Sequence, residues 1–354
     1  MDTEVFERIR VSLLEQRRNL ADWLTTTPAW KKQVRLGPVN EQAAQAHLQV
    51  LDTMIEKTQD QTLGLCEVCH DYIEPDRLEM DYTSSVCLDH LSAAEKNRLE
   101  AELELATKVQ QALLPQHVPD IPGLELAAFS RPADIVGGDY FDFFRFQDET
   151  HGLVIGDVAG HGMSASLLMA SLQASLRTLA PDYASPVEVV RRLNLLFCHN
   201  IHLSKFVTLF LARFDPQTRS LTYCNAGHNP PLLWRARPNG QESLAYLRPT
   251  GAAIGLVEEF QFGAETVTLA PGDILLLYTD GVTEATNPQE EEFGQERLVE
   301  LVRYGSPWSA QELVREVRRR LQEFTHGQPL ADDTTIVAGK IKKHHSGGAL
   351  PQNR

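Results

Sequence analysis

The sequence lacks any apolar run near the roughly 20 residues that a membrane span requires. Its first residues, MDTEVFERIRVSLLEQRRN, carry charges throughout and lack the apolar core of a signal peptide. Five cysteines are too few for a secreted disulfide framework. Basic residues are also scarce, because 33 Lys and Arg face 48 Asp and Glu, for a net charge of −15. Such a chain is poorly suited to the phosphate backbone of nucleic acid. We therefore expect a cytoplasmic protein that binds neither membrane nor nucleic acid directly.

What is present is an ordinary globular composition, 42% hydrophobic and 23% charged, over 354 residues, which predicts two or three structural units. Apolar residues recur at helical spacing on both sides of the stretch TTTPAWKKQVRLGPVN, and this predicts an antiparallel helical hairpin. The recurring residues are Phe6, Ile9, Leu13, Leu20 and Leu24, followed by Ala44, Leu48, Leu51 and Ile55.

A third helical pattern covers residues 92–115, with Ser92 as a plausible N-cap and Pro115 ending the run. Its apolar stripe consists of Leu99, Leu103, Ala106, Val109 and Leu113. The stripe suits simple packing on the neighbouring domain, and it equally suits a linker helix that transmits a signal or dimerises. We predict a linker helix over 92–115 and a homodimer.

The sequence pattern changes after Pro115. From there on, short runs typical of strands come in adjacent groups, with paired helical stretches between the groups. This grouping predicts α+β layering and not regular βαβ alternation. The runs are LELAAFS, HGLVIGDV, FVTLFLARF, SLTYCNAG, ETVTLA, DILLLYTD and TTIVAGKI, and the helical stretches begin at residues 163, 185 and 309. We assign one domain to residues 116–342 and a disordered tail to residues 343–354.

Two cysteine-rich pairs stand between the hairpin and the third helix. Cys66 and Cys69 form CEVC, and after seventeen intervening residues Cys87 and His90 form CLDH. Thiolates and an imidazole at this spacing suit tetrahedral zinc, with four protein ligands and therefore a structural role. Fortuitous buried thiols and redox chemistry through CEVC are the alternatives, and His70 is a weaker candidate ligand.

The stretch from His47 to Leu91 resembles the C-terminal part of the TraR/DksA zinc-finger family, through LQVLDTMIEK, GLCEVCHDYIEPDRLE and VCLDH. The preceding hairpin fits the coiled coil of that family, and residues 1–91 are then one module. Members bind RNA polymerase and insert acidic residues of the coiled-coil tip into its secondary channel. The tip here, WKKQVRLGPVN, is basic and has no Asp. The resemblance thus implies a docking or sensing unit, and an RNA polymerase-associated module with a regulatory phosphatase-like domain is the alternative function.

Acidic residues follow or precede several of the strand-like runs in the long domain. Asp139 lies in DIVGGDYFD, Asp157 in IGDVAGHGMSA, Asp280 in LLLYTDG, and Asp332 and Asp333 in ADDTTIV. A single Asp at a strand end is usually a turn former. Four such positions predict carboxylates that converge at one end of a sheet structure, where hard cations such as Mg²⁺ or Mn²⁺ would neutralise them.

From about Leu105 to Ile341 the chain resembles the metal-dependent PPM-type Ser/Thr protein phosphatases, in particular the stage II sporulation protein E/RsbU branch. The motifs that carry the resemblance are LATKVQQALLP, VGGDYFD, IGDVAGHGMSA, NAGHNPP, GAAIGL, LLLYTDGVTEA and DDTTIV. The family fold is a two-layered β sandwich flanked by helices. The expected fold is therefore α+β, a PPM-like sandwich preceded by a helical hairpin with a small zinc finger.

The resemblance also implies roles for individual residues. Asp157 would bridge two metal ions, the carbonyl of Val158 would add a ligand, and Asp280 and Asp332 would complete the second ion. Asp139 would hold metal-bound water or a third ion. We prefer Asp332 to its neighbour Asp333, because it takes the first position of the family's acidic pair.

Two departures from the eukaryotic branch leave phosphate binding and leaving-group protonation unassigned. Asp134 and Ala159 stand where related proteins of that branch have an arginine and a histidine. His161 lies nearby, and it suits either a proton donor or a structural role.

The function implied is hydrolysis of phosphoserine or phosphothreonine on a regulatory protein, with two or three Mn²⁺ or Mg²⁺ ions activating water. In the resembled branch the substrates are typically anti-sigma-factor antagonists with a STAS-type fold, so the protein would control transcription or stress signalling.

Overall fold

The computed structural model describes residues 3–28, 41–160, 162–200, 206–236, 242–328 and 330–342. The chain divides into two compact units, Met1–Glu102 and Leu103–Arg354. The basic hairpin tip WKKQVRLGPVN (residues 30–40), His161 and the tail at 343–354 lie outside the described residues. Within the described ranges, no helix combines the length and apolarity needed to cross a membrane.

The N-terminal unit is built on two long helices, α1 (Thr3–Thr26) and α3 (Glu41–Gln59). The start of α1 and the end of α3 line the same hollow, and Arg17 of α1 pairs with Asp52 of α3, so the two helices run antiparallel. Their facing apolar residues share one core with the cysteine-rich segment: Ile9, Leu13, Leu51, Ile55, Leu63, Cys66, Ile73, Leu78 and Cys87. The predicted helical hairpin is confirmed.

The cysteine-rich segment adds the short helix α4 (Pro75–Met80) and the 3₁₀ turn η1 (Leu88–His90), after which α5 (Ala93–Leu113) begins. Ser92 and Glu95 form a capping box: the Ser92 N–H and hydroxyl donate to the Glu95 carboxylate, and the Glu95 N–H donates back to the Ser92 hydroxyl. The predicted N-cap is confirmed. The boundary between the two units falls inside α5.

The C-terminal unit contains two five-stranded antiparallel sheets. The first sheet has the order β1 (Leu124–Arg131), β10 (Thr334–Ile341), β9 (Ile274–Tyr278), β6 (Leu232–Ala236) and β7 (Glu242–Tyr246). The second sheet has the order β2 (Tyr140–Arg145), β3 (His151–Val158), β4 (Val207–Asp215), β5 (Ser220–Ala226) and β8 (Glu265–Thr268).

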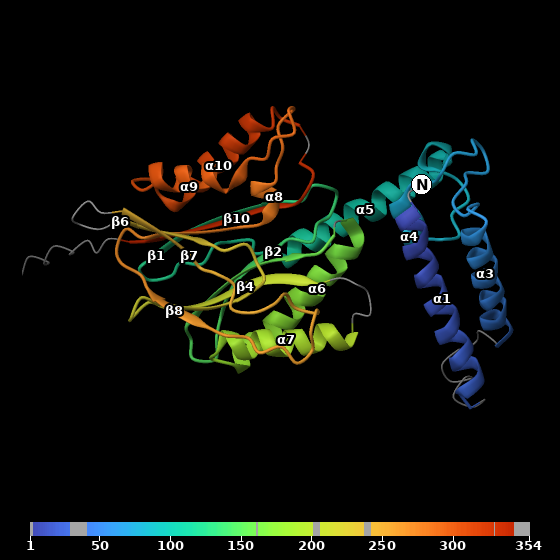
Figure 1. Ribbon diagram of the computed structural model, residues 1–354, viewed down its shortest axis with the longest axis horizontal. Coiled ribbons are helices and arrows are strands. Elements are labelled where there is room, and N and C mark those ends of the chain that lie inside the picture. Colours follow the sequence, from blue (N-terminus) through green and yellow to red (C-terminus); the bar gives the residue numbers. More distant parts are fainter. Residues whose placement is uncertain are drawn as a thin grey trace, which may run out of the picture. The chain divides into compact units, whose positions relative to one another are not determined.

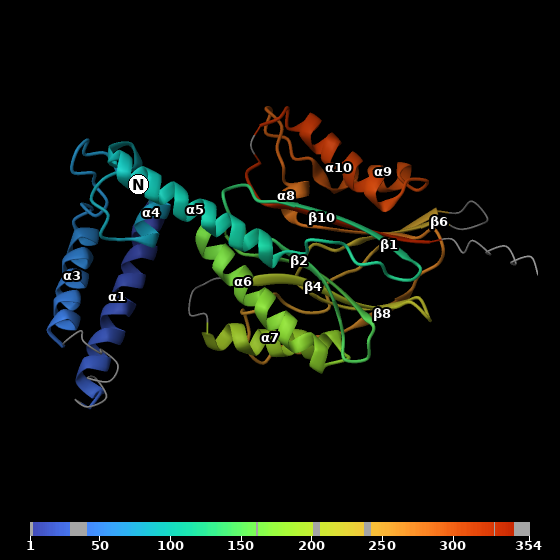
Figure 2. The same ribbon diagram turned by 180° about the vertical axis from the view of Figure 1, so that it is seen from behind.

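The sheets pack face to face, and helices cover both outer faces (Figures 1 and 2). Helices α9 (Gly294–Tyr304) and α10 (Ala310–Phe324) pack on the first sheet. Helices α6 (Gly162–Leu179) and α7 (Pro186–Asn200), with the 3₁₀ turn η2 (Ala180–Asp182) between them, pack on the second. Because both faces of each sheet are covered, a central strand such as β9 is buried at every residue. The predicted two-layered β sandwich flanked by helices is confirmed.

Strand β2 was not among the runs expected from the sequence, because Asp142 interrupts its apolar pattern. The structure buries this carboxylate completely and satisfies it: Arg177 donates to both of its oxygens at 2.6 and 2.7 Å, and the Tyr140 hydroxyl donates at 2.7 Å. A buried charge of this kind is tolerated only when it is paired. Strands β6 and β7 and helices α8 (Asp280–Thr283) and α9 were likewise not expected.

Candidate functional site

In each sheet, the strand ends next to the predicted carboxylates lie side by side at one end of the sheet. In the second sheet, β2 begins at Tyr140 opposite Gly156, close to the point where β3 ends. In the first sheet, β9 ends at Tyr278 opposite Ile336, close to the start of β10. The antiparallel pairing therefore brings Asp139 towards Asp157 in one sheet and Asp280 towards the Asp332–Asp333 pair in the other.

Hydrogen bonds connect these ends of the two sheets. The Asp333 carboxylate, at the start of β10, accepts the backbone N–H groups of Ala133 at 2.8 Å and Gly138 at 2.6 Å, in the loop before β2. The hydroxyl of Thr279 donates to Asp139 Oδ2 at 2.8 Å and accepts the Thr335 N–H at 3.0 Å. These bonds thus join the loop that carries Asp139 to the end of β9 beside Asp280 and to the start of β10 beside Asp332.

Two glycines allow close backbone approaches around these carboxylates. A Cβ on Gly138 would lie 2.9 Å from the carbonyl oxygen of Val158, and a Cβ on Gly281 would lie 2.0 Å from the carbonyl oxygen of Asp333. A side chain at either position would push the loops apart. Gly138, the second glycine of VGGD, therefore lets the loop that carries Asp139 lie against the carbonyl of Val158, a predicted metal ligand.

The carboxylates perturb one another strongly. Burial, followed by the charges of Asp280 and Asp332, raises the pKa of Asp157 to about 7. Burial and the charge of Asp157 raise the pKa of Asp139 well above its usual value, although Thr335 and Thr279 donate to it and act in the opposite direction. Groups that raise one another's pKa in this way lie within electrostatic reach, and divalent cations would relieve their repulsion. The donor set of carboxylate and carbonyl oxygens fits Mg²⁺ or Mn²⁺.

The structure separates the roles of the two neighbouring acids at the start of β10. Asp333 is 3% exposed, and its oxygens accept backbone N–H groups from the β2 loop. Asp332 is exposed, and its charge contributes to the raised pKa of Asp157. Asp332 accepts one backbone N–H, that of Asp333, at 2.8 Å. Asp333 therefore ties the β2 loop to the start of β10, and Asp332 remains the predicted ligand of the pair.

Sequence reasoning missed one further acid, Glu284. Its charge also raises the pKa of Asp157, and burial and the charge of Asp280 raise the pKa of Glu284 itself. It follows Asp280 by four residues, and the intervening chain is the single turn of α8. The i, i+4 spacing in TDGVTEA is the signal that could have identified it, because such residues share a helix face.

The C-terminal part of α5 belongs to the C-terminal unit, and it forms hydrogen bonds with the loop before Asp139. The side-chain amide of Gln110 donates to the Gly137 carbonyl at 2.6 Å and accepts the Gly137 N–H at 3.0 Å. The Thr107 hydroxyl donates to the Ile135 carbonyl at 3.2 Å. This end of the helix therefore packs on its own unit through polar contacts to the segment that positions Asp139.

The four predicted zinc ligands come together in the N-terminal unit. The ligand atoms of Cys66, Cys69, Cys87 and His90 all lie within 4.8 Å of one another, with 3.8 Å between the Cys69 and Cys87 sulfurs. A tetrahedral zinc with bonds of about 2.3 Å to sulfur has sulfur–sulfur edges of about 3.8 Å. Burial raises the pKa of the Cys66 thiol, but the backbone N–H groups of residues 69, 87 and 68 outweigh it and lower the pKa to about 6. His70 is exposed and lies outside this four-ligand group.

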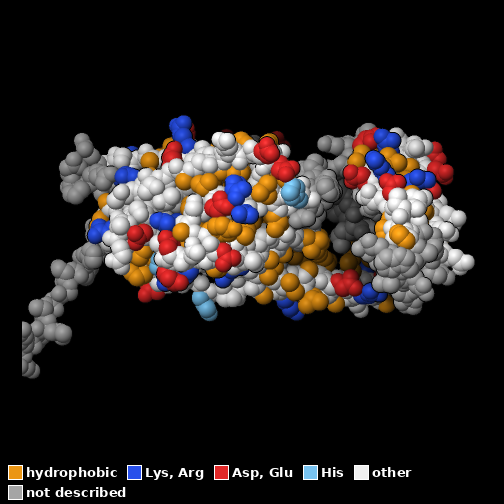
Figure 3. Space-filling view, turned by 90° about the horizontal axis from the view of Figure 1, so that it is seen from below, with side chains coloured by type: hydrophobic (Ala, Val, Ile, Leu, Met, Phe, Trp, Pro, Cys, Tyr) orange, Lys and Arg blue, Asp and Glu red, His pale blue; other side chains and the backbone are white. Residues whose placement is uncertain are grey.

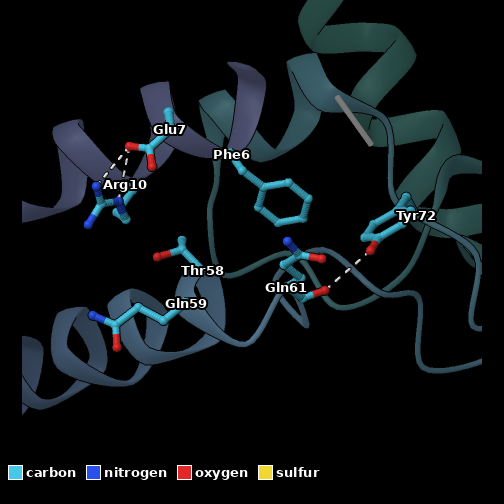
Figure 4. A pocket seen from close by; sticks show the side chains of 7 residues that line it. All are labelled: Phe6, Glu7, Arg10, Thr58, Gln59, Gln61 and Tyr72. Atoms are coloured by element: carbon cyan, nitrogen blue, oxygen red, sulfur yellow. Dashed lines mark hydrogen bonds and ion pairs between the residues drawn. The ribbon is translucent and has the colours of Figure 1, made fainter. Parts of the chain in front are cut away.

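A hollow of about 400 Å³ also lies in the N-terminal unit (Figure 4). Phe6 and Tyr72 meet edge to face on its wall, and the Tyr72 hydroxyl donates to the Gln61 carbonyl. Its charged residues, Glu7 and Arg10, pair with each other at 2.9 Å. The polar groups of these residues thus already have hydrogen-bond or ion-pair partners within the hollow. The Phe6–Tyr72 contact packs α1 against the cysteine-rich segment.

Seen from below, the side of the C-terminal unit that carries α6 and α7 mixes acidic, basic and apolar side chains (Figure 3). On α7, Glu188 pairs with Arg191 at 2.6 Å and with Arg192 at 3.2 Å. Opposite charges that neutralise each other in this way give a surface without a dominant sign over that helix.

Comparison with known proteins covers the C-terminal unit. The family described as Stage II sporulation protein E matches residues 147–342, a span that includes Asp157, Asp280 and Asp332. Phosphoserine phosphatase RsbU of Bacillus subtilis is 30% identical over 249 residues, which are 70% of this chain and 72% of that protein. Phosphoserine phosphatase RsbP of the same organism is 30% identical over 195 residues, 54% of this chain and 47% of that protein.

Solved structures share the fold. The SiaA-PP2C domain of Pseudomonas aeruginosa superposes with a TM-score of 0.60 at 22% identity, over 70% of this chain and 99% of that domain. The RsbU and RsbW domains of a Mycobacterium tuberculosis protein superpose with a TM-score of 0.54 at 27% identity, over 65% of this chain and 63% of that one.

Proposed function

This chain belongs to the stage II sporulation protein E family, and on that basis we propose that it is a metal-dependent protein serine/threonine phosphatase. The observation that carries the proposal is the convergence of Asp139, Asp157, Asp280 and Asp332 at the joined ends of two sheets. There, after burial, the charges of Asp280 and Asp332 raise the pKa of Asp157, and the charge of Asp157 raises the pKa of Asp139. A sandwich alone explains no such cluster, because four unneutralised carboxylates destabilise the site that holds them.

The proposed centre assigns a task to each of these residues. Asp157, the Val158 carbonyl, Asp280 and Asp332 hold the two cations, and Asp139 holds water or a third ion beside them. Bound Mn²⁺ or Mg²⁺ would supply an activated water and offset charge on the phosphoryl oxygens. Asp333, Thr279 and Gly138 keep the loops in register. Hydrolysis by such a water would need no nucleophilic side chain from this chain.

The substrate class follows from the relatives. RsbU and RsbP are named as phosphoserine phosphatases, and a phosphoserine or phosphothreonine on a regulatory protein is the proposed substrate here. We assign an anti-sigma-factor antagonist with a STAS-type fold as that protein, in keeping with the resemblance of the sequence to this branch. The activity would then control the release of a sigma factor.

For the N-terminal unit we propose one structural zinc ion, held by Cys66, Cys69, Cys87 and His90. The sulfur–sulfur distance of 3.8 Å and the gathering of all four ligand atoms within 4.8 Å of one another support it. All four ligands come from protein, so such an ion would stabilise the cysteine-rich segment and leave no position for a substrate.

Phosphate release from a phosphorylated STAS-type antagonist, measured with and without Mn²⁺, tests the phosphatase proposal. Wild-type protein should release phosphate only with the metal, and Asp157→Asn should abolish the reaction. Asp215→Asn is a matched control, since Asp215 ends β4 and accepts hydrogen bonds from Gln217 and Thr218 in its own turn. Equal activity of wild type and Asp157→Asn would refute the assigned centre.

A further inference from the structure

His228 is a buried histidine to which the metal chemistry gives no task. It lies in the NAGHNPP loop, residues 225–231, and its side chain is almost fully enclosed, with 2% of the residue exposed. Burial lowers its pKa to about 4, with the Tyr278 backbone acting in the opposite direction, so the ring is neutral at physiological pH. A neutral imidazole offers one donor and one acceptor. What those two nitrogens face decides what the residue does.

The loop holds this ring in one place. The Asn225 side chain accepts the His228 N–H at 2.8 Å and donates to the His228 carbonyl at 3.1 Å, and it also donates to the Leu247 carbonyl at 3.0 Å. Gly227 adopts a φ of +70°, and a Cβ there would lie 2.9 Å from the backbone nitrogen of Ala253. The backbone of His228 is therefore held in place by the Asn225 side chain and by the close approach at Gly227.

One ring nitrogen reaches the strand beside Asp157. His228 Nδ1 lies 2.9 Å from the hydroxyl oxygen of Thr208, and Thr208 is the residue of β4 paired with Asp157 of β3. The same hydroxyl lies 3.5 Å from the Asp157 carbonyl oxygen. A chain of two polar contacts thus leads from the ring to the backbone of the residue assigned to bridge the metals.

The loop that carries the ring joins the two sheets. It runs from the end of β5 in the second sheet to the start of β6 in the first, where Leu232 pairs with Leu276 of β9, and β9 ends two residues before Asp280. Among the described residues, His228 Nε2 has no hydrogen-bond partner. Through Thr208 on one side and this loop on the other, His228 therefore connects β4 of the second sheet with the β6–β9 pair of the first.

We propose that His228 is a positioning residue that sets the spacing of Asp157 and Asp280 through Thr208 and the end of β9, and so sets the affinity of the centre for its metal ions. The proposal depends on the proposed function, because it assumes a metal centre at these carboxylates. It assigns to the NAGH motif a role in metal affinity, without contact between the imidazole and either metal or substrate.

Mn²⁺ titration of the full-length protein tests the proposal, with binding followed by calorimetry and kcat measured at saturating metal. His228→Leu keeps the bulk and loses the polar nitrogens, and Thr208→Val removes only the hydroxyl. Each should weaken Mn²⁺ binding about tenfold, or about 1.4 kcal/mol, while kcat at saturating Mn²⁺ changes less than the affinity. His228→Asn retains a polar atom near the Nδ1 position and should recover most of the affinity.

Tyr223→Phe is the matched control, since it removes a buried hydroxyl whose 2.6 Å bond to Glu265 joins β5 and β8. It should lower thermal stability and leave Mn²⁺ affinity unchanged. If His228→Leu fails to fold, Thr208→Val still decides the matter. Wild-type Mn²⁺ affinity in Thr208→Val and in any folded His228→Leu protein, or an equal loss in Tyr223→Phe, would overturn the positioning role alone. Wild-type protein that neither binds Mn²⁺ nor releases phosphate would overturn the proposed function and this inference with it.

Discussion

Replacing Asp157 by Asn should stabilise the metal-free protein at alkaline pH while removing its response to metal. Asp157 has a pKa of about 7 in the folded, metal-free protein, raised by burial and by Asp280 and Asp332, against an ordinary value of 3.8. Between these two pH values the folded protein keeps a proton that the unfolded chain has released. Stability therefore falls as the pH rises from about 4 to 7, and above that range the full penalty of the ionised carboxylate applies.

The size of the effect follows from the same shift. A difference of about 3 pH units corresponds to about 4 kcal/mol, and this is an upper limit because the neighbouring acids titrate together. Asn carries no charge, so we expect metal-free Asp157→Asn to exceed wild type by about 1–4 kcal/mol at pH 8. At pH 5 the wild-type carboxyl is mostly protonated, and the difference should shrink.

Bound Mn²⁺ should reverse this order of stability, so that the wild-type protein becomes more stable than Asp157→Asn. A free Mn²⁺ concentration of 100 times the dissociation constant adds about 2.7 kcal/mol to the wild-type protein, whereas the variant, lacking a bridging ligand, should gain far less. Urea unfolding of both proteins at pH 5 and pH 8, with and without Mn²⁺, measures all of these quantities. Metal should be removed by gel filtration in metal-free buffer, because a chelator would also compete for zinc in the N-terminal unit.

Two outcomes would refute this reasoning. If metal-free Asp157→Asn is no more stable than wild type at pH 8, the carboxylates do not repel one another as the structure indicates. If Mn²⁺ stabilises both proteins equally, Asp157 is not a ligand. Asp215→Asn, the same chemical change in the turn after β4, should show neither effect, since that carboxylate accepts hydrogen bonds from its own turn.

Further predictions concern the zinc group and α5. Wild-type protein should retain one zinc per chain through purification and Cys66→Ser should retain none, as elemental analysis would show; zinc-free wild-type protein made with adequate zinc would disprove the site. Gln110→Ala, which removes both bonds to Gly137, should weaken Mn²⁺ affinity several-fold with little loss of thermal stability, and an unchanged titration would limit Gln110 to a structural contact. Charged substitutions at Leu99 and Leu103 should change Mn²⁺ affinity or kcat several-fold and weaken any dimer seen by light scattering. Unchanged activity and mass would make α5 a spacer.

Elements with a strong apolar pattern and residues at fixed short spacing were predictable from the sequence alone. The mostly apolar runs HGLVIGDV and TTIVAGKI specify β3 and β10, because a strand with both faces covered needs apolar residues on both faces. Ser92 and Glu95 specify the start of α5, because a capping box is a local interaction. The CEVC and CLDH spacings bring the two ligands of each pair together locally, and the fold of the seventeen residues between the pairs then joins them into one four-ligand group.

Only the tertiary structure decided what depends on distant segments. Strand β2 stayed hidden because Asp142 is acceptable there only with Arg177, 35 positions away along the chain, to neutralise it. The Asp333 carboxylate accepts the N–H groups of Ala133 and Gly138, which sequence proximity does not bring near it. His228 gains its place between β4 and β9 from the packing of two sheets. Hydrogen bonds and charges act over a few ångströms in space, and only the fold determines which residues come that close.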